Sequence, residues 1–168
     1  LPELPLTWWL TGLPAAGKTT LACGLNNCFI DQDRPFVLLD GDVLRAGLCS
    51  DLGFSPQDRT ENIRRVAEVA KVMNDSGVSV AVALVSPFRN ARAMARQIIG
   101  THRFIESYVS TSIALCSARD PKGLYARARI DPGFLLTGPN APYEPPECPE
   151  VVVNTEIMSI DAAIEILV

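Results

Sequence analysis

The sequence has 168 residues, of which 48% are hydrophobic and 20% are charged, and its formal net charge is −4. This length and composition predict one compact domain and exclude a long disordered tail or a fibrous repeat. The net negative charge argues against non-specific binding to nucleic acid, because no global positive field would attract a phosphate backbone. The longest apolar run, residues 78–85, is far shorter than the roughly 18 residues that span a bilayer, so no membrane partner is expected.

Five cysteines are scattered along the chain without a C-x-x-C pair: Cys23, Cys28, Cys49, Cys116 and Cys148. They indicate neither a disulfide framework nor a zinc site, and we expect a reducing, cytoplasmic location. The chain begins with Leu1, and residues 1–6 form a stiff, linker-like start. Such a start is typical of a domain that has been cut from a longer polypeptide.

Apolar runs alternate with helical patterns, which is typical of a parallel sheet covered by helices on both faces. The predicted strands comprise residues 7–11, 36–40, 78–85, 104–110 and 151–154. The predicted helices comprise residues 18–30, 55–76, 86–100 and about 161–168. The sequence therefore predicts an α/β three-layer sandwich with a five-stranded, mainly parallel sheet. Trp8 and Trp9 would lie on opposite faces of the first strand.

The interval from Arg119 to Pro149 has a different composition. It contains seven of the thirteen prolines and the basic residues Arg119, Lys122, Arg127 and Arg129. A structureless stretch of this length inside a compact domain is usually functional. We therefore expect residues 119–149 to form a mobile lid and substrate loop.

Residues 12–19 match the pattern G-x-x-x-x-G-K-[ST] between a predicted strand and a predicted helix. Its glycines let backbone N–H groups point inward, and the helix N-terminus adds partial positive charge at the same point. Lys18 supplies a cation for the β and γ phosphates, and the Thr19 hydroxyl can bind Mg²⁺. The candidate ATP-binding residues are Gly12, Leu13, Pro14, Ala15, Ala16, Gly17, Lys18, Thr19, Thr20 and Arg119.

Two acids follow the second predicted strand. Asp40 and Asp42 flank Gly41 at the carboxyl end of that strand, where open α/β sheets bind ligands. One carboxylate can organise magnesium while the other accepts a proton from an attacking hydroxyl. We favour Asp42 as the base, although position alone does not separate the two. The alternative is that one of them only caps the next helix.

Several arginines lie on the predicted helices. Arg59 and Asn62 share a face at the start of the long helix and are suited to a phosphate or sulfate and a sugar or base edge. Arg64 and Arg65 should face water. In the row Arg89, Arg92 and Arg96, the first could face a phosphate, and we expect the other two to be solvated. The single histidine, His102, has no expected role.

With these segments placed, the chain resembles adenylyl-sulfate kinase, also called APS kinase, over nearly its whole length. The resemblance rests on the segments Leu-Asp-Gly-Asp (39–42), Asp-Leu-Gly-Phe-Ser (51–55), Asp-Arg-Thr-Glu-Asn-Ile-Arg-Arg (58–65), Ser-Pro-Phe-Arg (86–89), Phe-Ile-Glu-Ser-Tyr-Val (104–109), Arg-Asp-Pro-Lys-Gly-Leu-Tyr (119–125) and Tyr-Glu-Pro-Pro (143–146). It implies a P-loop kinase fold. The implied reaction transfers the γ-phosphate of ATP, with Mg²⁺, to the 3′-hydroxyl of adenosine 5′-phosphosulfate (APS), giving 3′-phosphoadenosine 5′-phosphosulfate (PAPS).

The resemblance also implies roles for single residues. It places Phe54 on the substrate adenine and Arg45, Arg59 and Lys122 on the phosphosulfate. Other implied site residues are Asn62 as a substrate ligand, Ser86 at the edge of the active site and Asp42 near the 3′-hydroxyl. A homo-oligomer is common in the family.

The chain departs from the family pattern mainly in the lid. Val43 and Ala46 replace a common Asn and His, and residues 130–138 lack the usual lysine. Leu136 takes the place of an aromatic residue that packs on the substrate adenine, unless Phe134 reaches that position. The loss of one ring face predicts base stacking weaker by about 1 to 3 kcal/mol.

Two other readings of the sequence remain open. One is a catalytically weak, nucleotide-binding regulatory domain fused to ATP sulfurylase, which would suit the linker-like start and the altered lid. The other is a small-molecule kinase of similar fold that acts on a sugar acid.

Overall fold

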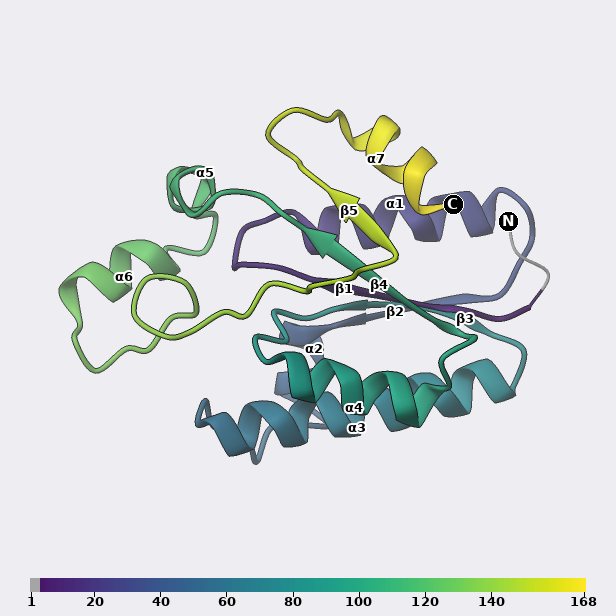
Figure 1. Cartoon of the computed structure of the whole chain (residues 1–168), viewed down its shortest axis with the longest axis horizontal. Coiled ribbons are helices and arrows are strands. Elements are labelled where there is room, and N and C mark those ends of the chain that lie inside the picture. The colour runs from purple at the N-terminus through teal and green to yellow at the C-terminus, as the bar shows by residue number, and fades with distance from the viewer. Residues whose placement is uncertain (1–3) are drawn as a thin grey trace.

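Five strands form a parallel sheet at the centre of the molecule (Figure 1). The computed structural model describes residues 4–168, so the first residues of the expected linker-like start lie outside the described part. The strands are β1 Thr7–Thr11, β2 Phe36–Asp40, β3 Ser79–Ala83, β4 Phe104–Val109 and β5 Val151–Val153. Their order across the sheet is β2-β3-β1-β4-β5. Because all five run parallel, their carboxyl ends lie at one edge.

Helices cover both faces of this sheet, which confirms the predicted three-layer arrangement (Figure 1). The helices α1 (Lys18–Ile30) and α7 (Ile160–Leu167) lie on one face, and α3 (Pro56–Asp75) and α4 (Arg89–Ile99) lie on the other. The short helices α2 (Gly41–Ala46), α5 (Ile113–Arg119) and α6 (Leu124–Ile130) complete the described chain. None of the described helices is both long and apolar enough to cross a membrane.

The two tryptophans of β1 lie in different halves of the hydrophobic core, one on each face of the sheet, as their alternation predicts. Trp8 packs with Phe29 on the side of α1, at a ring-centroid distance of 5.5 Å, and its Nε1 donates to the Leu167 carbonyl at 2.7 Å. Trp9 stacks on Phe104 on the side of α3 and α4. Both tryptophans are buried. Each therefore anchors one helical layer to the central strand.

The predicted bounds of β1, α1 and β2 agree with the structure, whereas three short helices were not predicted. Helices α2, α5 and α6 span only six or seven residues each, too few for an apolar period to show. The expectation of a structureless lid was wrong, because α6 lies within it. The helix expected from residue 86 begins instead at Arg89, since Ser86 has a φ of 41° and Phe88 is extended.

The buried amide of Asn74 joins the end of α3 to the start of the sheet. Its Oδ1 accepts from the Thr7 hydroxyl at 2.8 Å, and its Nδ2 donates to the Val78 carbonyl at 3.0 Å. Asn74 is only 1% exposed. These bonds satisfy polar groups that water does not reach.

Replacing Asn74 with alanine should lower the free energy of unfolding by about 2 kcal/mol, because the Thr7 hydroxyl and the Val78 carbonyl would lose a buried partner. Urea denaturation measures this change. Val72→Ala, at a site that is 62% exposed on the same helix, is the matched control and should shift stability by less than about 0.5 kcal/mol. Equal effects of the two substitutions would contradict this account.

Candidate functional site

A cavity of about 1220 Å³ opens at the carboxyl edge of the sheet. Its walls come from the loop after β1, from α2, from the start of α3, from the segment after β3 and from the region around α6. The expected site residues that line it are Pro14, Ala15, Gly17, Lys18, Thr19, Thr20, Asp40, Asp42, Arg45, Phe54, Arg59, Asn62, Ser86, Arg119, Lys122 and Leu136. The structure thus brings together residues that are distant in the sequence.

The loop of residues 12–19 depends on backbone conformations that favour glycine. Gly12 and Gly17 have φ values of 154° and 108°. A Cβ atom at Gly12 would lie 2.6 Å from the Val109 carbonyl oxygen, so a side chain there would clash with the backbone of β4. Gly12, Leu13 and Ala16 do not line the cavity. They support the loop, whose remaining residues face the cavity ahead of the N-terminus of α1.

Lys18 is buried beside the loop that carries it. Its Nζ donates to the carbonyls of Gly12, at 3.0 Å, and Leu13, at 2.7 Å. Burial lowers the pKa of this amine to about 8. A buried cation whose partners are neutral carbonyls is well placed to exchange them for an anion in the cavity.

Thr19 and Asp40 meet at the start of α1. The Thr19 hydroxyl donates to Asp40 Oδ2 at 2.7 Å, while Asp40 Oδ1 accepts from the Asp42 amide at 2.9 Å and caps α2. The capping alternative therefore describes one oxygen of Asp40, and the other oxygen lies with the Thr19 hydroxyl. Among the described residues, no group of three or more His, Cys, Asp or Glu side chains forms a metal cluster.

These two oxygen donors fit magnesium rather than a fully protein-bound metal. Mg²⁺ prefers hard oxygen ligands and usually keeps waters and substrate phosphates in its coordination shell. Thr19 and Asp40 both line the cavity beside the phosphate-type loop. A carboxylate and a hydroxyl are then sufficient protein ligands.

Asp42 forms an ion pair with Lys122, which lies between α5 and α6. Both side chains are more than half exposed, at 69% and 57%. This contact connects the region expected to be the lid with the acid at the end of β2. Asp42 and Lys122 are 80 residues apart in sequence, so no local pattern predicts the pair.

The guanidinium groups of Arg45 and Arg59 lie next to the exposed ring of Phe54. The Arg45 and Arg59 Cζ atoms lie 4.3 and 5.5 Å from the ring centroid. Arg59 Nε donates to the Phe54 carbonyl at 3.0 Å, and Arg45 donates to the Gly53 carbonyl at 3.0 Å. Burial and, to a lesser extent, the charge of Arg45 lower the pKa of Arg59. The cluster offers an aromatic face beside two cations, which suits a base linked to an anion.

Two buried polar atoms that belong to cavity-lining residues have no hydrogen-bond partner among the described residues. They are Nδ2 of Asn62 and Oγ1 of Thr137, on residues that are 4% and 1% exposed. A buried donor without a partner costs about 1 to 3 kcal/mol. Such atoms in a cavity wall indicate that a polar ligand completes them. Asn62 was predicted from the sequence, whereas Thr137 was not.

Arg119 and Thr155, which both line the cavity, meet beside the loop backbone at Ala16. Arg119 donates to the Thr155 hydroxyl at 2.8 Å and to its carbonyl at 2.9 Å. The Thr155 hydroxyl in turn donates to the Ala16 carbonyl at 3.1 Å. Sequence reasoning missed Thr155. The available signal was its place two residues after β5, at the carboxyl edge where the other site residues lie.

Phe134 and Leu136 both line the cavity, so an aromatic ring does reach it from the altered lid segment. Leu136 is 6% exposed and packs in the core with Tyr125. The Arg127 Cζ atom lies 4.2 Å from the Phe134 ring centroid. Phe134 thus supplies a ring at the cavity although Leu136 occupies the expected aromatic position.

Ser86 lines the cavity, and its hydroxyl is hydrogen-bonded within the protein. Its Oγ accepts from Trp9 Nε1 at 3.0 Å and donates to the Leu84 carbonyl at 3.2 Å. Ser86 is 3% exposed. The side chain therefore holds the turn, and its backbone faces the same wall of the cavity.

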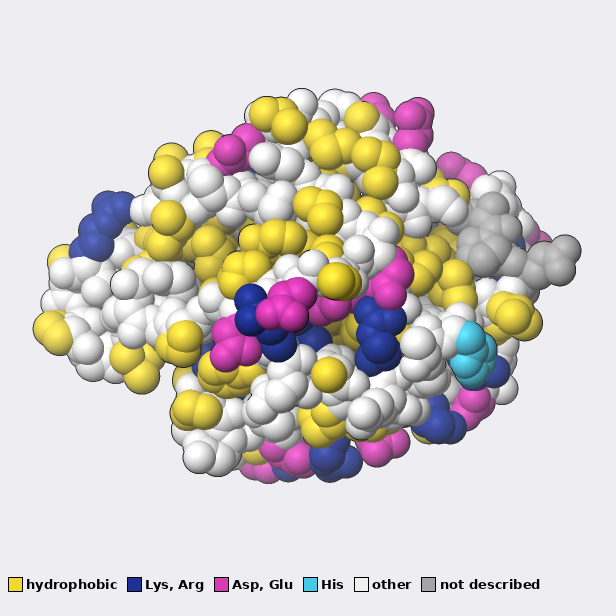
Figure 2. All heavy atoms as spheres, in the orientation of Figure 1, with side chains coloured by type: hydrophobic (Ala, Val, Ile, Leu, Met, Phe, Trp, Pro, Cys, Tyr) yellow, Lys and Arg dark blue, Asp and Glu magenta, His cyan; other side chains and the backbone are white. Residues whose placement is uncertain are grey.

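The expectation that Arg92 and Arg96 are solvated was wrong. Arg92 is 2% exposed and pairs with Glu106, while Arg96 pairs with Glu150. Figure 2 shows basic and acidic side chains interleaved at the centre of one face of the molecule. Helical spacing alone indicated an exposed row because the acidic partners lie on other segments.

The profile of the adenylylsulphate kinase family matches residues 4–154. An adenylyl-sulfate kinase of Pseudomonas aeruginosa is 45% identical over 163 residues, which cover 97% of this chain and 83% of that protein. The structure of the Mycobacterium tuberculosis APS kinase in complex with AMPPNP and APS superposes with a TM-score of 0.92 at 38% identity, covering 98% of this chain and 95% of that one. The hexameric APS kinase from Thiobacillus denitrificans has a TM-score of 0.71 at 30% identity, covering 97% of this chain and 28% of that one.

The lowered pKa of Lys18 predicts a pH-dependent stability. Because the folded pKa is about 8 and the ordinary value is 10.5, the unfolded chain binds more protons between these values, and stability due to Lys18 rises with pH across this window. Relative to Lys18→Met, the wild type should gain about 2 kcal/mol between pH 7 and pH 10. Urea denaturation at both pH values measures the difference. Lys71→Met is the matched control for the loss of a lysine charge. If the difference in free energy of unfolding between the wild type and Lys18→Met did not change with pH, the burial argument would be wrong.

Proposed function

The chain belongs to the adenylyl-sulfate kinase family, and from this premise we propose how its cavity transfers the γ-phosphate of ATP to the 3′-hydroxyl of APS, giving PAPS. The observation that carries the proposal is one cavity lined both by the phosphate loop with Lys18 and by the Phe54 cluster with its two arginines. Phosphoryl transfer requires both nucleotides in one enclosure, with the reacting atoms in line.

The loop of residues 12–19 holds the phosphates of ATP. Its N–H groups and the N-terminus of α1 favour negative charge. Lys18 releases the carbonyls of Gly12 and Leu13 and binds the β and γ phosphates. Arg119, held by Thr155 behind the loop, bounds the nucleotide on the side of α5.

The Thr19 hydroxyl and the Asp40 carboxylate, whose oxygens lie 2.7 Å apart, would hold magnesium. Bound there with ATP, the ion would supply positive charge to neutralise the phosphate oxygens. The bond from Asp40 to the Asp42 amide fixes the carboxylate, so that the cap of α2 also orients a metal ligand.

APS occupies the other end of the cavity. Its adenine stacks on Phe54, with Phe134 or Leu136 from the lid region as the second wall. Arg45, Arg59 and Lys122 bind the phosphosulfate, and the unpartnered amide of Asn62 donates to the nucleoside. The negative charges of both substrates account for a concentration of cations in a protein whose net charge is −4.

Asp42 orients the 3′-hydroxyl and accepts its proton as the oxygen attacks the γ-phosphorus. The bond from that phosphorus to the bridging oxygen breaks, and ADP leaves with the bond's electron pair. Before this step Lys122 exchanges the carboxylate of Asp42 for the phosphosulfate, which frees the base when substrate is present. Coupling of the base to substrate binding in this way limits transfer to water.

The proposal also covers the oligomeric state and the location of the protein. We expect a homo-oligomer, in keeping with the hexameric relative, and a cytoplasmic enzyme. Fusion to ATP sulfurylase in a longer polypeptide remains the alternative arrangement, in which the domain would be weakly catalytic. The cavity favours the active enzyme, because Lys18, Thr19, Asp40 and Asp42 all line it.

The deciding experiment incubates the chain with ATP, Mg²⁺ and APS and separates the nucleotides by chromatography. We expect PAPS and ADP in equal amounts, and neither product when APS is replaced by gluconate. ADP formed with gluconate would support the sugar-acid reading. Nucleotide binding without any product would support the regulatory reading.

Asp42→Asn should lower kcat about 10²- to 10⁴-fold, because the amide does not accept the hydroxyl proton, while ATP affinity stays within about twofold. Steady-state kinetics and nucleotide titration measure the two quantities. The matched control is Asp33→Asn, an exposed acid in the turn after α1, which should retain full turnover. Normal turnover by Asp42→Asn would remove Asp42 from the role of base.

A further inference from the structure

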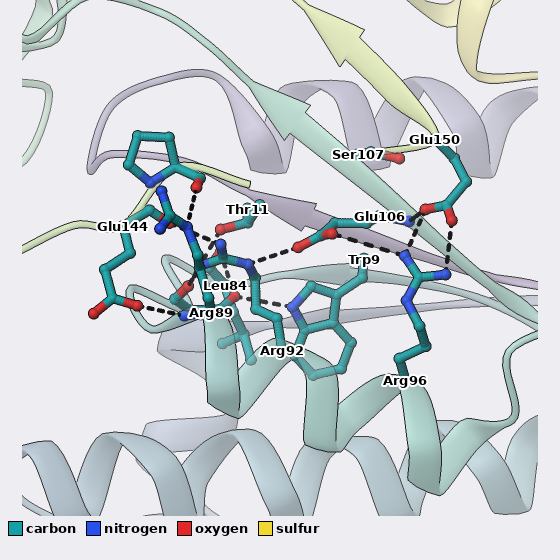
Figure 3. Close-up of polar contacts among 12 residues, drawn as sticks. Trp9, Thr11, Leu84, Arg89, Arg92, Arg96, Glu106, Ser107, Glu144 and Glu150 are labelled. Carbon is teal, nitrogen blue, oxygen red and sulfur yellow. Dashed lines mark hydrogen bonds and ion pairs between the residues drawn. The ribbon is translucent and has the colours of Figure 1, made fainter. Parts of the chain in front are cut away.

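Arg92 is a buried arginine for which the reaction described above has no use. It lies in α4, is 2% exposed and uses its guanidinium to contact three different segments (Figure 3). Nε donates to Glu106 Oε1 at 2.7 Å, NH1 donates to the Ser86 carbonyl at 2.6 Å, and NH2 donates to the Glu144 carbonyl at 2.7 Å. A buried arginine is costly unless its donors are satisfied, so these three contacts define its place.

The first of these segments is a strained turn in the cavity wall. Ser86 has a φ of 41°, which a residue with a side chain rarely adopts and which costs about 1 to 3 kcal/mol. The hydroxyl of Thr11 donates to the Val85 carbonyl at 2.8 Å, and Trp9 Nε1 donates to the Ser86 hydroxyl. Arg92 supplies the charged donor to the same turn. Together these donors hold a conformation that the local sequence does not favour.

The segment that leads into this turn packs against Gly41, the residue before the proposed base. A Cβ atom at Gly41 would come within 2.8 Å of Leu84 Cδ2 and 3.3 Å of the Ala83 carbonyl oxygen. Gly41 precedes Asp42 directly, and residues 84–87 line the cavity together with Asp42. A shift of the turn would therefore move the wall next to Asp42, whereas the Ala16 carbonyl of the phosphate loop is held by Thr111 and Thr155.

The second segment is the end of the lid region. The Glu144 amide donates to the Pro87 carbonyl at 2.8 Å, and the Arg89 amide donates to Glu144 Oε2 at 2.8 Å. Tyr143 hydrogen-bonds Thr11 at 3.0 Å, with its ring 6.0 Å from the Arg92 Cζ atom. Arg92 thus ties the chain that returns from the lid to the same turn that faces the cavity (Figure 3).

We propose that Arg92 is a positioning residue for the acceptor nucleotide: it fixes the Ser86 turn and the base of the lid region as one unit beside Asp42. This inference rests on the proposed function. Only a planar fork with several fixed donors can hold a carboxylate and two carbonyls at once, whereas a lysine would keep the charge beside Glu106 and lose the fork. We expect the consequence to be selective, because the segment that leads into the turn packs against Gly41, next to Asp42, which we place at the APS end of the cavity.

The test compares Arg92→Lys with Arg96→Lys. The control makes the same change one helical turn further along α4, where Arg96 pairs with Glu150, lies 3.7 Å from Glu106 Oε2 and, among the described residues, makes no hydrogen bond to Ser86. For Arg92→Lys we expect the KM for APS to rise about tenfold or more, with the KM for ATP within about twofold of wild type. Arg96→Lys should leave both values within about twofold.

A double variant, Arg92→Met with Glu106→Gln, protects the test against failure to fold, because it removes the buried charges together. We expect the same selective rise in the KM for APS. Equal rises in both KM values, an unchanged KM for APS, or failure of both Arg92 variants to fold would show a purely structural role and overturn the proposal. The wild type distinguishes this proposal from the proposed function. If the wild type makes no PAPS, both are overturned; if it makes PAPS, the results for the variants test the role of Arg92 alone.

Discussion

The site depends on one constraint, which is that all five strands run parallel. Parallel strands end at the same edge, so the loops after β1, β2, β3 and β5 converge although they are far apart in sequence. The two tryptophans of β1 fix this arrangement by anchoring a helical layer on each face. The rigid sheet then sets the spacing between the phosphate loop, the acids of residues 40–42 and the Ser86 turn, which is the spacing that in-line transfer needs.

Charge in the cavity is balanced by groups that a nucleotide can replace. Lys18 is bound to carbonyls, Lys122 to Asp42 and Arg119 to Thr155. Each cation thus has a defined position and a partner that an incoming phosphate or sulfate can displace. Because Lys122 pairs with the proposed base, the proposed mechanism makes binding of the acceptor and release of Asp42 one event. In this mechanism the cations change partners when the substrates bind, and the sheet need not rearrange.

A second polar network, centred on Arg92, differs in that its partners are groups of the protein that no substrate replaces. Arg92 is enclosed by Glu106 and two carbonyls, with no cavity face of its own. Its outer neighbours Arg89 and Arg96 bind Glu147 and Glu150 near the surface, where ion pairs contribute little to stability. Of these three arginines, Arg92 is the one that contacts the sheet through Glu106, the Ser86 turn and the chain returning from the lid region.

The sequence by itself determined the fold class, the bounds of β1, α1 and β2, and the phosphate loop, because apolar periodicity, the glycines and Lys18 are local signals. Most of the site residues that it identified, through motifs at strand ends and through the family resemblance, line the cavity. Only the tertiary structure decided that α6 occupies the lid region, that Lys122 pairs with Asp42 and that Arg92 is buried. Each of these depends on contacts between segments many residues apart, and a side chain's own spacing does not reveal whether a carboxylate from a distant strand will meet it.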